Sequence, residues 1–108
     1  MSKAVAENRF MLQALAKARP ALITAVLKTC NLSCITAISE LTANCYYSVV
    51  PLSHTQIEQL RRYKSVIESL SDKRVSVKQK RALLISHPAL VPKILVPSLK
   101  FLGNFVHG

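Results

Sequence analysis

The residues of this chain with the clearest chemical potential are basic and lie close together in the sequence. Between positions 61 and 81, eight basic residues stand against two acidic ones, Glu68 and Asp72. A solubility surface usually mixes both signs, whereas a positive excess attracts polyanions. We therefore expect contacts with nucleic-acid phosphates, with a merely solvated helix face as the alternative. The basic residues are Arg61, Arg62, Lys64, Lys73, Arg74, Lys78, Lys80 and Arg81.

The formal net charge of +10 agrees with a nucleic-acid partner or an anionic membrane surface. The sequence contains no recognisable helix-turn-helix spacing and no Asn/Arg pattern for reading bases. We therefore expect non-specific binding, with double-stranded DNA as the favoured partner.

The other reactive residues do not form a motif. Cys30 and Cys34 share a helix face, but only Cys45 and His54 could join them as metal ligands, and no C-x-x-C motif is present. Small core residues are the favoured interpretation of the cysteines. The two glycines, at positions 103 and 108, form no phosphate loop. We expect a protein that is not an enzyme and uses no cofactor or metal.

Two predicted helices would carry the basic residues. Ser53 and Gln56 form a capping-box pattern, and Ser76 and Gln79 repeat it. After the first box, apolar residues recur at positions 57, 60, 63, 67 and 70, which predicts an amphipathic helix of about five turns. A shorter second helix would pack Val77, Leu83 and Leu84. Residues 53–86 are thus predicted to form a basic helical hairpin.

The segments before this hairpin are more apolar. Residues 1–19 predict an N-terminal helix that buries Val5, Met11, Leu12 and Leu15, and Pro20 would open the next helix. Residues 21–47 favour a buried core helix. A helix broken near Asn31 and a transmembrane helix are the alternatives, although the run without charges between Lys28 and Glu40 is short for a membrane span. The predicted buried face consists of Leu22, Val26, Cys30, Ile38, Leu41 and Cys45.

The tail, residues 88–108, has an apolar face that would either dock on the core or lie in a membrane interface. Pro92 and Pro97 are expected to kink it, and Lys93, Pro97, Lys100 and Asn104 would form the opposite, polar stripe. Two lysines near the middle disfavour full membrane spanning. The predicted membrane or partner face consists of Leu90, Val91, Ile94, Leu95, Leu102, Phe105 and Val106.

Together these patterns predict a single all-α domain over residues 1–108, a small bundle of four or five helices with a Pro-kinked C-terminal segment. The chain has only two glycines and no tryptophan, and it is rich in helix-forming residues. Three cysteines in apolar sequence indicate a reducing compartment rather than a disulfide framework. Charges at Lys3, Glu7 and Arg9 interrupt any signal-peptide pattern, so we expect an intracellular and not a secreted protein.

The order of these parts resembles the short basic virion proteins of Polinton-type and adintovirus-type DNA elements. The resemblance is carried by VVPLSHTQIEQLRRYKSVIESLSDKRVSVKQKRALLI followed by PALVPKILVPSLKFLGNF, roughly residues 21–106. It implies a virion protein comparable to adenovirus core and minor capsid proteins, found in the virion and in the host nucleus or cytoplasm. Members of that family often carry Gly-Gly after the second basic block, where this chain has Ser86, His87 and Pro88.

Three functions follow as hypotheses. The first is nucleic-acid binding in a core or packaging role. The second is a minor capsid or membrane-active protein that uses residues 88–106 against capsid protein or anionic lipid. The third is a scaffold that forms homo-oligomers through the apolar segment 21–47.

Overall fold

A computed structural model describes residues 2–103, and every regular element in that range is a helix. The all-α prediction is confirmed, but the predicted number of four or five helices is wrong, since the described range contains eight. The Cα radius of gyration is 12.5 Å, close to the roughly 13 Å of a folded domain of about 100 residues. The helices are α1 (Lys3–Glu7), α2 (Arg9–Lys17), α3 (Pro20–Thr29), α4 (Leu32–Tyr46), α5 (His54–Arg61), α6 (Lys64–Ser71), α7 (Val77–Ser86) and α8 (Leu90–Phe101).

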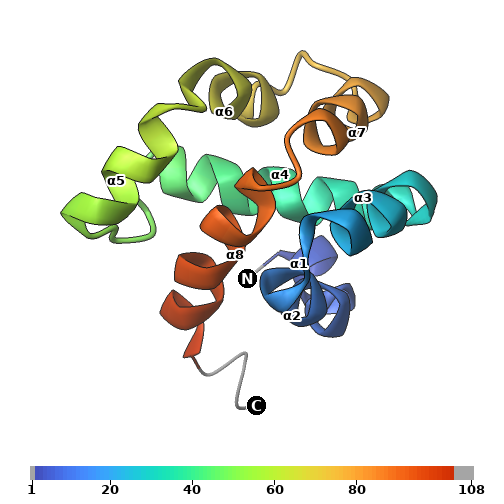
Figure 1. Ribbon diagram of the computed structural model, residues 1–108, viewed down its shortest axis with the longest axis horizontal. Coiled ribbons are helices and arrows are strands. Elements are labelled where there is room, and N and C mark those ends of the chain that lie inside the picture. The colour runs from blue at the N-terminus through green and yellow to red at the C-terminus, as the bar shows by residue number, and fades with distance from the viewer. Residues whose placement is uncertain (1, 104–108) are drawn as a thin grey trace.

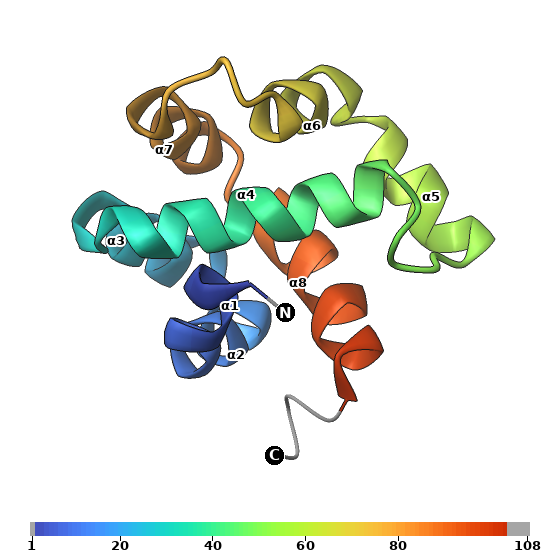
Figure 2. The same cartoon turned by 180° about the vertical axis from the view of Figure 1, so that it is seen from behind.

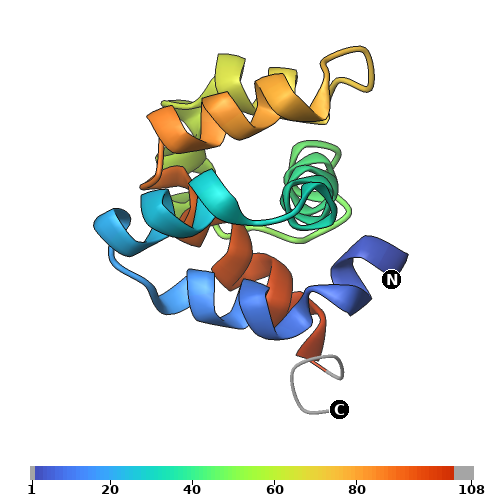
Figure 3. The same ribbon diagram turned by 90° about the vertical axis from the view of Figure 1, so that its right-hand side faces the viewer.

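The central element is α4, the longest helix, which packs against α1, α6, α7 and α8. Figures 1 and 2 show α6 and α7 on one side of α4 and α1, α2 and α8 on the other, with α5 beside the C-terminal end of α4. In Figure 3, α4 is seen almost end-on between these two layers. The basic segment of the sequence therefore runs from the end of α4 back along one side of it, and we call its three helices the α5–α6–α7 layer.

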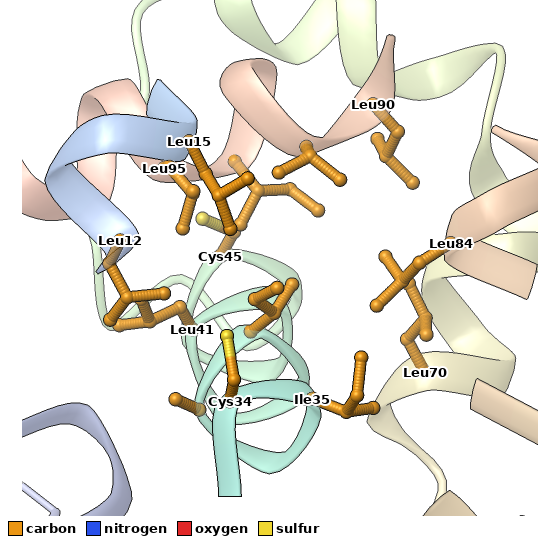
Figure 4. Close-up of a cluster of buried hydrophobic side chains, with 14 of the residues drawn as sticks. Leu12, Leu15, Cys34, Ile35, Leu41, Cys45, Leu70, Leu84, Leu90 and Leu95 are labelled. Carbon is orange, nitrogen blue, oxygen red and sulfur yellow. The ribbon is translucent and has the colours of Figure 1, made fainter. Parts of the chain in front are cut away.

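The core surrounds α4 on both sides (Figure 4). Ile35, Ile38 and Leu41 of α4 are fully or almost fully buried. The other layers contribute leucines that point toward α4, and burying each contributes about 1.5 to 3 kcal/mol relative to leaving it exposed. These are Leu12 and Leu15 of α2, Leu70 of α6, Leu84 of α7, and Leu90 and Leu95 of α8.

The long predicted helices are each interrupted by a capping or turning residue. Asn31 is the N-cap of α4, and its side chain accepts a hydrogen bond of 3.0 Å from the Cys34 N–H. Of the three interpretations of residues 21–47, the broken helix is therefore the one found, with its second half as the core helix. Asn8 separates α1 from α2 and donates to Ala4 O and to Ser33 Oγ across the fold.

Two of the predicted buried faces, those of residues 1–19 and 21–47, are wrong in part because the helices are interrupted. Leu22 is 57% exposed and Met11 is 40% exposed, although both were expected in the core. Because α3 and α4 are separate helices, they do not share one continuous stripe, and α3 instead buries Ile23 and Leu27. The predicted five-turn basic helix likewise ends at Arg61, and α6 begins at Lys64.

The start signals read from the sequence are confirmed. Both capping boxes are complete, with Ser53 and Gln56 bonded reciprocally at 2.8 and 3.1 Å, and Ser76 and Gln79 at 3.2 and 3.1 Å. Pro20 occupies the first position of α3, where its missing N–H costs nothing. Local side-chain chemistry thus sets where these helices begin.

The turn after α4 contains the only non-glycine residue with positive φ in the range 2–103, Ser48 at 61°. The Val49 N–H donates to Asn44 O at 2.8 Å, and the Ser48 N–H donates to Cys45 O at 3.3 Å. This is the Schellman arrangement, which usually places glycine where this chain has Ser48.

The described part of the tail, residues 88–103, docks on the core through α8. Leu90, Val91, Ile94 and Leu95 are fully buried, and Leu102 is half-buried. Phe105 and Val106, like Asn104, lie outside the described residues. The predicted polar stripe is wrong at Pro97, which is buried because α8 packs on both α2 and α4.

No single helix within residues 2–103 is long and apolar enough to cross a membrane. The pair α7 and α8 meets the length and composition criteria only when taken together, and the two helices are bent by 108°.

Candidate nucleic-acid interface

All eight predicted basic residues lie in the α5–α6–α7 layer, in two groups (Figure 1). The first group, Arg61, Arg62 and Lys64, lies between the end of α5 and the start of α6. The second group follows α6 and continues into α7. Because Lys64 is the first residue of α6, the seven residues of the helix that follow it separate the groups by about 10 Å at a rise of about 1.5 Å per residue. The second group consists of Lys73, Arg74, Lys78, Lys80 and Arg81.

The first group is exposed to solvent. Arg61 Nη1 lies 3.0 Å from Glu58 Oε1, which partly neutralises it. Arg62 and Lys64 form no ion pair with any residue from 2 to 103. Arg61 and Arg62 also line a hollow of about 610 Å³ together with Lys93 of α8. Sequence reasoning did not associate Lys93 with this group, because some thirty positions separate them and no local pattern connects them.

In the second group, Arg74 is held by Asp72. Its Nε and Nη2 donate to the two carboxylate oxygens at 3.1 and 3.0 Å, and its backbone N–H donates to Oδ1 at 2.8 Å. These hydrogen bonds hold the pKa of Asp72 below its usual value, and the ion pair raises the pKa of Arg74. The charge of Arg74 is thus largely balanced, while Lys73 and Lys78 are exposed and Lys80 is half-buried.

Arg81 has a structural contact that its position in the sequence does not predict. Its Nη1 donates a 2.7 Å hydrogen bond to the Leu27 carbonyl oxygen, in the last turn of α3. The last carbonyls of a helix lack partners within the helix and carry partial negative charge, so a cation is favourable there. Arg81 therefore joins α7 to the C-terminal end of α3, and this guanidinium is directed inward.

Five of the eight basic residues make no ion pair with the described part of the chain and do not cap another helix. They occur in both groups, so positive charge lies at both ends of α6, which itself carries Glu68 between them. The five are Arg62, Lys64, Lys73, Lys78 and Lys80.

The cysteines belong to the core. Cys34 and Cys45 are buried and Cys30 is half-buried. Burial, assisted by the neighbouring Cys30 thiol, raises the pKa of Cys34 to about 12, although Arg81 acts in the opposite direction. Burial also raises the pKa of Cys45, whose Sγ lies 3.5 Å from Ser98 Oγ. Residues 2–103 contain no group of three or more His, Cys, Asp or Glu side chains that could hold a metal ion.

Comparison of the chain with protein-family models, with curated proteins and with solved structures found no match.

Proposed function

We propose that this chain is a non-enzymatic protein that binds nucleic acid through phosphate contacts made by the α5–α6–α7 layer. The observation that carries the proposal is the set of five basic side chains, Arg62, Lys64, Lys73, Lys78 and Lys80, that lack an ion-pair partner among residues 2–103. Only Glu68 and Asp72 are acidic between positions 61 and 81, whereas a surface that served solubility alone would mix the two signs more evenly.

The spacing of the two groups suits a duplex. Double-stranded DNA carries one charge per roughly 1.7 Å of axis, so the ~10 Å between the groups corresponds to about six phosphate charges. Both groups can therefore contact the same duplex. Flexible lysines provide point charges without base recognition, which agrees with non-specific binding.

The test is the binding of a random-sequence duplex at about 50 and about 200 mM salt, measured by fluorescence anisotropy. Five phosphate contacts predict a slope of log K against log salt of about −4.5, or an affinity about 500-fold lower at the higher salt. The test variant replaces Arg62, Lys64, Lys73 and Lys78 with alanine, and its slope should be shallower by about 3.6.

A matched control removes four exposed basic residues from outside this layer that form no ion pair within residues 2–103, namely Lys17, Arg19, Lys28 and Lys100. Both variants lose the same charge, but only the test variant should lose the steep salt dependence. If both variants weaken binding equally, general attraction to a positive protein would explain the binding, and a defined interface would be refuted.

The resemblance to virion proteins of Polinton-type elements supports a core or packaging role for such binding, inside the virion and the host nucleus or cytoplasm. The alternative of a minor capsid or membrane-active protein has less support. Four of its seven proposed contact residues, Leu90, Val91, Ile94 and Leu95, are buried against the core. Homo-oligomerisation through residues 21–47 has less support for the same reason, since α4 already buries its apolar face within the chain.

A further inference from the structure

An apolar groove of about 480 Å³ opens beside the first basic group, between the end of α4, the segment 48–52, and helices α5 and α6. Its inner surface includes the buried side chains of Val50, Leu60 and Ile67. Its outer part includes Tyr46 and Ile57, which are 42% and 43% exposed. A volume of this size falls in the ordinary range for small-molecule sites, which is about 300 to 1,000 Å³.

Two cations complete the lining of this groove. Arg61, at the end of α5, and Lys64, at the start of α6, both line it and are both exposed. No acidic residue is part of the lining. An apolar interior with positive charge on one side is complementary to a molecule with an apolar body and one anionic end.

We propose that this groove binds a carboxylate with an unbranched apolar chain, that is, a fatty-acid anion. The chain would lie against Val50, Leu60 and Ile67, and the carboxylate would lie between Arg61 and Lys64. Arg61 is held by Glu58 at 3.0 Å, and Glu58 does not line the groove. An exposed pair of this kind is weak, so the guanidinium can exchange Glu58 for a ligand carboxylate. The proposal does not require nucleic-acid binding, although Lys64 would take part in both.

The test compares three ligands that share one chain and differ only in the charge of the end group: decanoate, decan-1-ol and decylamine. Each is titrated into the ¹⁵N-labelled full chain, and amide chemical shifts give both the location and the affinity. Decanoate should shift the signals of residues around Val50, Ile57 and Leu60. It should bind about tenfold more tightly than the alcohol, a ratio that falls within the range for two exposed ion pairs, and the amine should bind most weakly.

Substitutions in α5 separate the specific contact from general charge. Arg61→Gln should weaken decanoate binding about threefold and leave decanol binding unchanged. Arg62→Gln makes the same change of charge one position away, but Arg62 does not line the groove, so decanoate binding should stay as in the original chain. Glu58→Gln removes the competitor of the ligand carboxylate and should tighten decanoate binding. Ile57→Asp should weaken binding of both decanoate and decanol.

Three results would overturn the proposal. Decanol could bind as tightly as decanoate, decanoate could shift signals far from the groove, or Arg61→Gln and Arg62→Gln could have the same effect. Sedimentation of the same samples tests whether a second copy of the chain occupies the groove instead. A dimer that Ile57→Asp dissociates, in a chain that does not bind decanoate, would make the groove an interface between two copies.

Discussion

The role of Arg81 offers the sharpest test of the arrangement of the basic layer. The structure directs its guanidinium to the Leu27 carbonyl at 2.7 Å, whereas the sequence alone places it among the phosphate-binding residues. The informative substitution is Arg81→Met, because methionine keeps most of the apolar stem and removes only the charged group. Lys78→Met is the matched control, since Lys78 is exposed on the same helix.

The size of the expected effect follows from this contact. A hydrogen bond from a charged donor contributes about 1.5 to 3 kcal/mol, and a cation at a helix C-terminus adds about 0.3 to 1 kcal/mol. Because Arg81 is only half-buried, we expect a loss near the lower end, about 2 kcal/mol of unfolding free energy. A loss of about 1 kcal/mol lowers the thermal unfolding midpoint of a domain of this size by about 4 to 8 °C, so Arg81→Met should lower that midpoint by about 8 to 16 °C. Lys78→Met should change the unfolding free energy by less than about 0.5 kcal/mol.

Two assays applied to both variants separate the two roles. Circular dichroism during thermal and urea denaturation measures stability, and the salt dependence of duplex binding measures phosphate contacts. Arg81→Met should be destabilised and keep its salt slope, whereas Lys78→Met should be stable and have a slope shallower by about 0.9. The reverse outcome, a stable Arg81→Met protein with a shallower slope, would refute the structural role of Arg81.

Further predictions concern the turn after α4, the break before it and the buried thiols. Ser48→Gly should raise the unfolding free energy, measured in urea, by about 0.5 to 1 kcal/mol. A left-handed conformation costs an L-residue about 1 to 2 kcal/mol; glycine avoids this cost but loses more backbone entropy on folding, which offsets part of the gain. A loss of stability would contradict the Schellman assignment. Asn31→Ala should lower stability by about 1 kcal/mol through loss of the N-cap, and Asn31→Asp should restore it. The thiol of Cys34 keeps its proton to about pH 12 in the folded protein, so its contribution to stability is complete below the ordinary thiol pKa near 9 and is lost as the pH rises toward 12. Cys34→Ala should therefore flatten the decline of unfolding free energy over that range, and an unchanged slope would show that other groups cause the decline.

The sequence by itself determined the all-helical class of the fold and the starts of α3, α5 and α7. Both capping boxes and Pro20 at the first position of α3 were predicted correctly, because these signals act within three or four residues of the chain. It also brought eight basic residues into one stretch, and their placement in a single layer follows from that proximity. Its periodicity identified much of the core, including Leu12, Leu15, Ile38 and Leu41.

Only the tertiary structure decided how the helices are divided and which apolar faces are covered. Periodicity cannot distinguish one long helix from two short ones with different axes, which is why Leu22 was expected inside and lies outside. An amphipathic tail has the same pattern whether it meets a membrane or a core, and the packing of α8 against α2 and α4 settled that Leu90 and Ile94 are buried. The contact of Arg81 with Leu27 joins residues that are distant in the sequence, so no local pattern could reveal it. The groove beside Arg61 is lined by residues 45–67 alone, but it exists only because α4, α5 and α6 fold against one another.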